Sequence, residues 1–117
     1  MPNRNSYLEF LLEQLAPLGE ITTRGMFGGH TLYCDGVVFA LVADNALYLK
    51  ADDHNRPGFA SRGLGAFRPF EDQAGAMQYY QAPPEMFEDP DALRHWGGGA
   101  VATGQRAAAK KKARVKR

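Results

Sequence analysis

The sequence predicts an α+β domain in two layers, with helices packed on a single antiparallel sheet. Three features predict this class. An amphipathic segment opens the chain, short extended segments separated by tight-turn residues follow it, and helix-forming residues close the chain. The expected order is helix, three strands, helix, two strands, helix. Because short hairpin turns join antiparallel neighbours, we expect consecutive strands to pair with each other.

The first helix is expected to begin at Ser6. Ser6 and Glu9 have the spacing of a capping box, in which side chains satisfy the unpaired backbone N–H groups of the first turn. Pro17 and Gly19 then end the helix. Between Ser6 and Pro17 the helix has one apolar stripe with the spacing i, i+3, i+4 and i+7, formed by Leu8, Leu11, Leu12 and Leu15.

The first extended segment covers residues 21–34. The pair Gly28-Gly29 inside it indicates a bulge, a bend or a close approach of two backbones. Asp35-Gly36 predicts a type I′ turn, because both central positions of that turn require positive φ. The second segment covers residues 37–43. A tight turn at Asp44-Asn45 leads from it to a third segment, residues 46–51.

Helix and strand signals alternate in the second half of the chain. Asp52 or Asp53 is expected to cap a short helix that ends near residue 62, and strands are expected over residues 66–71 and 76–82. Asp89-Pro90 then opens the last helix. Three glycines at residues 97–99 cost about 1 kcal/mol each relative to alanine, so either packing overrides that cost or the helix breaks there. Residues 105–114 favour a further helical piece.

Charge is distributed unevenly along the 117 residues. Residues 1–105 contain 7 Lys and Arg against 13 Asp and Glu, a net charge of −6, whereas residues 106–117 contain 7 Lys and Arg and no acid. We therefore expect a folded domain over residues 1–104 and a basic tail over residues 105–117. One cysteine, no recognisable signal peptide and no apolar run near the ~20 residues of a membrane span indicate a cytoplasmic protein without membrane contact.

Several short motifs follow one another in a specific order: Arg24-Gly25-Met26-Phe27-Gly28-Gly29, Leu32-Tyr33, Asp35-Gly36, Phe39-Ala40-Leu41-Val42, Leu47-Tyr48-Leu49-Lys50, Arg56-Pro57, Tyr79-Tyr80, Pro83, and Asp89-Pro90 with Leu93 and Trp96. This set resembles the TfoX N-terminal domain family over about residues 5–102. The resemblance implies an α+β fold in the order given above. It also implies a regulatory role, since the TfoX or Sxy proteins regulate natural competence alongside the cyclic-AMP receptor protein and carry a second, helical domain for which this chain has no room.

No catalytic residue, metal or cofactor is expected. Cys34 lies beside Asp35, whose charge raises the thiol pKa, so a buried packing role is expected. The three histidines lack metal-ligand spacing. The glycine-containing segment joins two strands and lacks the Gly-Lys-Ser/Thr of a phosphate-binding loop. It is interpreted either as a structural bulge or as a recognition site formed by Arg24, Met26, Phe27, Gly28 and Gly29.

Two candidate contact surfaces remain. Alternation places Tyr33, Tyr48 and Lys50 on the sheet face opposite the apolar one, together with either Tyr79 or Tyr80, of which Tyr80 is our choice. This face is either an ordinary solvated surface or a protein interface, for a homodimer or for a partner. The tail is either a solvated helix end or a non-specific electrostatic arm for nucleic acid, formed by Arg106, Lys110, Lys111, Lys112, Arg114, Lys116 and Arg117.

The sequence therefore predicts a small non-enzymatic regulatory adaptor. It acts by protein contact, with transcription machinery as one class of partner, and its tail adds weak nucleic-acid affinity. The alternative is a dimeric scaffold or a small-molecule-binding module that uses the tyrosine-bearing face.

Overall fold

The computed structural model describes residues 6–26, 29–43, 45–66 and 78–115, with the side chains of residue 26 and of residues 112–115 left out. It contains one five-stranded antiparallel sheet in the order β1-β2-β3-β4-β5, so the predicted α+β class is confirmed. The strands are β1 (Ile21–Met26), β2 (Gly29–Cys34), β3 (Val37–Ala43), β4 (Ala46–Lys50) and β5 (Tyr79–Gln81).

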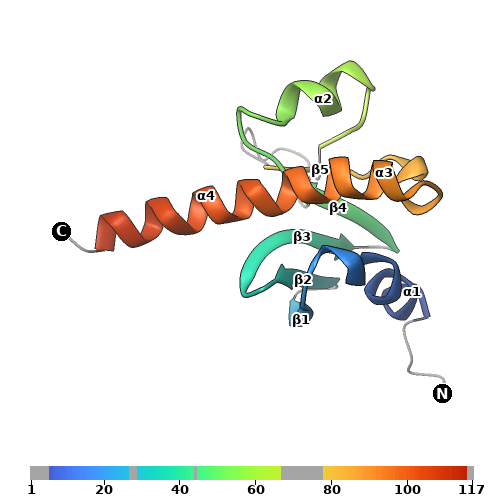
Figure 1. Cartoon of the computed structure of the whole chain (residues 1–117), viewed down its shortest axis with the longest axis horizontal. Coiled ribbons are helices and arrows are strands. Elements are labelled where there is room, and N and C mark those ends of the chain that lie inside the picture. Colours follow the sequence, from blue (N-terminus) through green and yellow to red (C-terminus); the bar gives the residue numbers. More distant parts are fainter. Residues whose placement is uncertain (1–5, 27–28, 44, 67–77, 116–117) are drawn as a thin grey trace.

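The helical elements flank this sheet (Figure 1). The chain opens with α1 (Ser6–Leu15) and a 3₁₀ turn, η1 (Ala16–Leu18), and it carries α2 (Arg56–Ser61) between β4 and β5. After β5 come a second 3₁₀ turn, η2 (Pro84–Phe87), α3 (Pro90–Ala92), a π-helical turn, η3 (Leu93–Gly97), and α4 (Gly98–Val115). α4 crosses the sheet, and its C-terminal part projects beyond it (Figure 1).

The predicted first extended segment is in fact two strands. β1 and β2 pair antiparallel with Met26 opposite Gly29, so the chain reverses direction there instead of continuing past a bulge. The register shift between β2 and β3 lies elsewhere, between Leu32 and Tyr33. The presence of glycine at position 29 has a separate structural reason. A Cβ atom there would lie 2.1 Å from the carbonyl oxygen of Val42. Close backbone approach therefore explains this glycine.

Other local predictions are confirmed or corrected by the backbone. Asp35 (φ 49°) and Gly36 (φ 88°) both have the positive φ that the predicted turn requires. Of the strand predicted over residues 66–71, Ala66 forms an isolated bridge to Tyr80, and the other residues lie outside the described part of the chain. Of the strand predicted over residues 76–82, Tyr79–Gln81 form β5, and residues 76 and 77 lie outside the described part of the chain.

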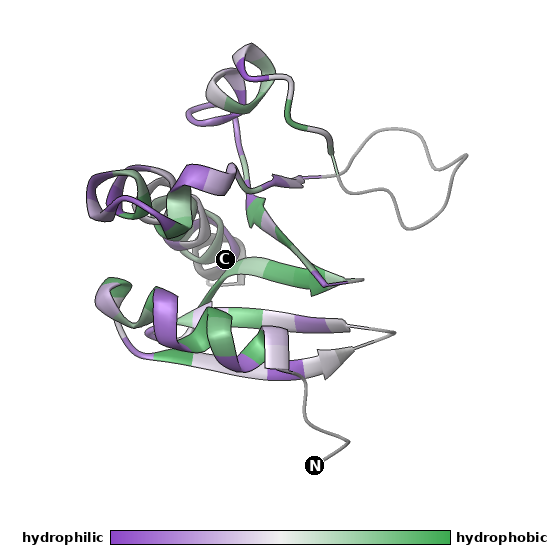
Figure 2. Ribbon diagram, turned by 90° about the vertical axis from the view of Figure 1, so that its right-hand side faces the viewer, coloured by the Kyte–Doolittle hydropathy of each residue, from purple (hydrophilic) through white to green (hydrophobic). Residues whose placement is uncertain are grey.

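The core lies between one face of the sheet and the helices. Leu11 and Leu15 of α1 and Ala100 of α4 belong to one buried cluster with Leu32 and Leu49 of the sheet. β3 is largely hydrophobic along its length (Figure 2). Burial of this apolar surface is the main favourable contribution to folding.

Packing overrides the poor helix propensity of the glycines near the start of α4. The helix continues from the π-helical turn into α4 without a break. A Cβ atom on Gly97 would lie 2.7 Å from Leu18 Cδ1, and one on Gly104 would lie 2.1 Å from the carbonyl oxygen of Val38. Because any larger residue would push α4 away from β3 at Gly104, this glycine sets how closely the helix approaches the sheet. The predicted helical piece at residues 105–114 is confirmed as the second half of the same helix.

Candidate functional site

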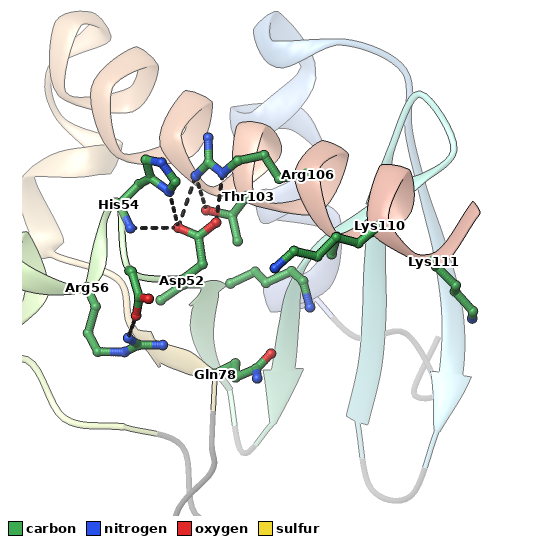
Figure 3. Close-up of a pocket in the computed structure, with 12 residues that line it drawn as sticks. Asp52, His54, Arg56, Gln78, Thr103, Arg106, Lys110 and Lys111 are labelled. Carbon is green, nitrogen blue, oxygen red and sulfur yellow. Dashed lines mark hydrogen bonds and ion pairs between the residues drawn. The ribbon is translucent and has the colours of Figure 1, made fainter. Parts of the chain in front are cut away.

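A cleft of about 600 Å³ lies between α4 and the turn that follows β4 (Figure 3). α4 forms one wall, and the end of β4, the turn leading to α2 and Gln78 form the other. All of its lining residues except two alanines have polar or charged side chains: Lys50, Ala51, Asp52, Asp53, His54, Arg56, Gln78, Thr103, Arg106, Ala107, Lys110 and Lys111. The cleft brings Lys50, predicted on the tyrosine-bearing face, together with Arg106, Lys110 and Lys111 of the predicted tail.

The turn after β4 is fixed by a local network of side-chain hydrogen bonds. The backbone N–H of His54 donates to Asp52 Oδ1 (2.9 Å), and the backbone N–H of Asp52 donates to Asn55 Oδ1 (2.8 Å). Asn55 Nδ2 then donates to the carbonyl oxygen of Lys50 (3.0 Å). These bonds are typical of Asx turns. The prediction that Asp52 or Asp53 caps the helix is wrong, because α2 begins at Arg56 with Asn55 at the N-cap position.

Asp52 also joins this turn to α4. Arg106 donates to it through two nitrogens, Nε to Oδ2 at 2.7 Å and Nη2 to Oδ1 at 3.0 Å (Figure 3). Arg106 Nη2 further donates to Thr103 Oγ1 (3.1 Å), whose hydroxyl donates to the carbonyl oxygen of Gly99 (3.0 Å). The Arg106 hydrogen bond is the main reason why the pKa of Asp52 lies far below its usual range, and the His54 backbone N–H also lowers it. Arg106 is therefore a structural tether, which corrects its predicted place on a free tail.

The remaining cations of the cleft differ in their surroundings. Arg56 pairs with Asp53 (2.6 Å). Within the described part of the chain, Lys50, Lys110 and Lys111 form no ion pair. Lys50 Nζ lies 5.0 Å from the centroid of the Tyr79 ring, a favourable cation–π arrangement. Burial lowers the pKa of Lys50, and the nearby Asp52 partly opposes this shift.

Strand register decides which tyrosine lies on the outer face. Tyr79 is opposite Lys50, whereas Tyr80 is opposite the buried Leu49. The ring of Tyr80 stacks on that of the buried Phe59 at 5.2 Å. Tyr80 was therefore the wrong choice for the outer face, and Tyr79 takes its place. Burial raises the pKa of Tyr79, and the nearby Tyr33 raises it further.

Two other predicted site residues, Arg24 and Tyr48, lie in one row across the sheet. The register aligns Arg24 of β1, Thr31 of β2, Leu41 of β3 and Tyr48 of β4. Arg24 is exposed on the edge strand, and Tyr48 is half-buried. This row and Lys50 place one end of the outer face beside the cleft.

The family model for the TfoX N-terminal domain matches residues 13–103. This segment contains the whole sheet, α2 and the turn that carries Asp52. The chain belongs to the TfoX N-terminal domain family. The predicted resemblance is thereby confirmed, and with it membership of a family of regulators.

Two curated relatives share this domain. An uncharacterized 12.7 kDa protein in the trpE 5′ region of Spirochaeta aurantia is 33% identical over 92 residues, which cover 76% of each chain. Protein Sxy of Escherichia coli strain K12 is 51% identical over 39 residues, covering 33% of this chain and 19% of Sxy. The likeness to Sxy thus covers about a third of this chain and about a fifth of Sxy.

The structure does not describe the side chains of several predicted site residues of this TfoX N-terminal domain. Phe27, Gly28, Lys116 and Arg117 lie outside the described residues. Met26, Lys112 and Arg114 belong to β1 and α4 by their backbone, without a described side chain. Cys34 is buried as expected, and its Sγ donates to the carbonyl oxygen of Leu18 at 3.4 Å. Burial, reinforced by Asp35, raises the pKa of the Cys34 thiol.

Sequence reasoning missed the groups that build the cleft wall. The sequence predicts Asp52 only as a helix cap and Arg56 only as part of a family motif. Gln78 and Thr103, which also line the cleft, belong to no predicted site. The family-matched segment ends at residue 103, and Arg106 lies three residues beyond it on α4. In the described residues no group of three or more His, Cys, Asp or Glu side chains is placed to hold a metal ion. Nor does any helix of the described chain have the length and apolarity to cross a membrane.

Proposed function

We propose that this TfoX N-terminal domain is a non-enzymatic regulatory adaptor of the cytoplasm that works by surface contact. The basic half of α4 supplies non-specific affinity for nucleic acid, and the rest of the domain contacts a protein partner of the transcription machinery. The observation that carries the proposal is the second half of α4, a helix that extends beyond the sheet (Figure 1). Its residues 107–111 are exposed. Residues 106–117 contain seven Lys and Arg and no acid, a net charge of +7.

The charge distribution supports this role. A body with a net charge of −6 repels phosphate, so attraction to nucleic acid concentrates on the one segment of opposite sign. Cations that contact phosphates release condensed counterions, and the affinity therefore falls as salt rises. Such contacts give affinity without sequence preference, which suits an auxiliary role beside a sequence-specific partner.

The test is the salt dependence of binding to a fluorescently labelled 20-base-pair DNA. With at most seven phosphate contacts, the slope of log K against log salt should be no steeper than about −6. Replacing Lys112, Arg114, Lys116 and Arg117 by glutamine keeps the chain length and helix-forming residues while removing four charges. This variant should weaken binding and reduce the slope by about 3 to 4. Arg94→Gln, a single exposed cation on the π-helical turn, serves as the control. Unchanged affinity in the four-residue variant would remove nucleic-acid contact by the tail from the proposal.

A second function is favoured by the tyrosines of the outer face. Tyr33, Tyr48 and Tyr79 are half-buried on the side of the sheet away from α1 and α4, and aromatic residues are enriched at protein interfaces. This face would make the protein a dimeric scaffold or a small-molecule-binding module. Light scattering should then show a dimer of the wild-type protein and a monomer of Tyr48→Ala. The protein concentration would range from about 5 to about 500 µM, roughly a hundredfold range around typical weak affinities. A monomer at every concentration would contradict the dimeric form.

A further inference from the structure

The cleft beside α4 holds more positive than negative charge. Two carboxylates line it, Asp52 and Asp53, and each already has a guanidinium partner, in Arg106 and Arg56 respectively. Lys50, Lys110 and Lys111 add three further cations, for which the described residues supply no carboxylate. Lys110 extends from α4 toward the cleft, and Gln78 lies across from it (Figure 3). The two arginines of the lining balance its two carboxylates, and the three lysines leave an excess of positive charge.

Lys50 is the most informative of these lysines. Its side chain is half-buried beside Tyr79, and burial disfavours its charged form, as its lowered pKa indicates. A cation that has lost part of its water gains more from an incoming anion than one that is fully hydrated. The backbone of Lys50 is also fixed, because its carbonyl oxygen accepts from Asn55 and because Asp52 ties the following turn to Arg106 of α4.

The size and continuity of the cleft indicate what kind of anion fits. A volume of about 600 Å³ lies within the range of small-molecule sites and exceeds what one isolated ion fills. Along α4 the lining runs from Thr103 to Lys111, so it includes the start of the basic half of this helix. From residue 106 to residue 114 the helix rises about 12 Å, which is long enough to follow several phosphates of a nucleic-acid strand. A polyanion of regular spacing matches this arrangement better than a single carboxylate does.

We propose that the cleft seats one phosphate group of a nucleic-acid strand between Lys50 and Lys110, while neighbouring phosphates follow the basic half of α4. Arg106 and Asp52 are positioning residues, since their pairing sets the distance between α4 and the turn that carries Lys50. This inference rests on the proposed nucleic-acid contact and names the residues of the folded domain that take part in it. It assigns Lys50, which lies outside the tail, a direct contact with phosphate.

The experiment compares binding of a labelled ten-nucleotide oligo-dT to the full chain and to three single variants. Lys50→Gln and Lys110→Gln should each weaken binding about five- to tenfold and reduce the salt slope by about 1. Arg94→Gln removes the same charge away from the cleft and should change the affinity less than twofold. Lys110 is exposed on the helix surface, so its variant keeps the fold even if Lys50→Gln does not. Circular dichroism of each variant identifies any loss of folding.

The outcomes separate this inference from the proposed function. If both cleft variants bind as Arg94→Gln does, while the four-residue tail variant loses affinity, the cleft contact is wrong and the tail contact stands. If the full chain binds the 20-base-pair DNA but not the oligonucleotide, the inference fails and the proposed function stands; if it binds neither, both fail. A poly-glutamate peptide that binds in a Lys50-dependent way, without oligonucleotide binding, would also overturn the inference. Displacement of the oligonucleotide by AMP but not by adenosine identifies a terminal phosphate as an occupant, and resistance to AMP identifies an internal phosphodiester.

Discussion

The two halves of α4 are stabilised in opposite ways. Residues 98–104 include three glycines, the residue with the lowest helix propensity after proline, yet this half lies against the sheet. Residues 105–115 are rich in alanine, lysine and arginine, which favour helix, and residues 107–111 are exposed. Tertiary packing thus holds the helix where its local sequence disfavours it, and local propensity extends it where packing ends.

This division separates structural from binding roles within one helix. The packed half cannot accept a larger residue at Gly104 without moving away from β3, whereas the exposed half can carry any charge that its function requires. Arg106 lies at the boundary, and its pairing with Asp52 fixes the point where the helix leaves the domain. A projecting helix held in this way presents Lys110 and Lys111 from a fixed backbone.

The largest expected effect comes from Gly104→Ala. The added methyl group would lie 2.1 Å from the carbonyl oxygen of Val38, which is backbone and cannot rotate away. Moving α4 off the sheet would loosen the core, so we expect a loss of about 3 kcal/mol or more in the free energy of unfolding. Urea denaturation followed by circular dichroism measures this loss.

Gly98→Ala is the matched control in the same helix. A Cβ atom there would meet nothing within 4 Å, so only the helix propensity changes. We expect a gain of about 1 kcal/mol, opposite in sign to the effect at Gly104. Equal effects of the two substitutions would show that packing does not distinguish these glycines.

Much of this fold is encoded locally and could be predicted. The turn at Asp35-Gly36 follows from its need for positive φ, and the alternation of Leu47, Tyr48 and Leu49 follows from the pleat of a strand. A glycine pair is more ambiguous, because it suits both a bulge and a reversal. Only the pairing of β1 with β2 resolves it.

The candidate site was predictable only in pieces. The tail cations and Lys50 were recognised separately, but their meeting depends on how α4 crosses the end of β4. Asp52 and Arg106 are 54 positions apart, so no local pattern indicates their ion pair. The choice between Tyr79 and Tyr80 likewise needed the register of β5 against β4, because alternation alone says only that one of them faces outward.

The smallest expected effect concerns the Asp52–Arg106 tether. In Asp52→Asn the amide oxygen can still accept from the His54 N–H, so the turn is retained, whereas the charge and the second acceptor for Arg106 are lost. We expect a modest decrease in the melting temperature at neutral pH. Because folding lowers the pKa of Asp52, its stabilisation is complete above the ordinary carboxyl pKa of about 3.9 and is lost as the pH falls below that value.

The difference in melting temperature between the wild-type protein and Asp52→Asn should therefore be constant from pH 7 to about pH 4 and should shrink as the pH is lowered from about 4 toward about 2. Asp91→Asn is the control, since its partner Arg94 is an exposed neighbour on the same helical segment and ties no two elements together. A difference between the wild-type protein and Asp52→Asn that stays constant across this whole range would mean that the carboxylate charge does not act as the tether. In that case the packing of the first half of α4 on the sheet, which includes the buried Ala100 and the close contact at Gly104, would set the direction in which the basic half leaves the domain.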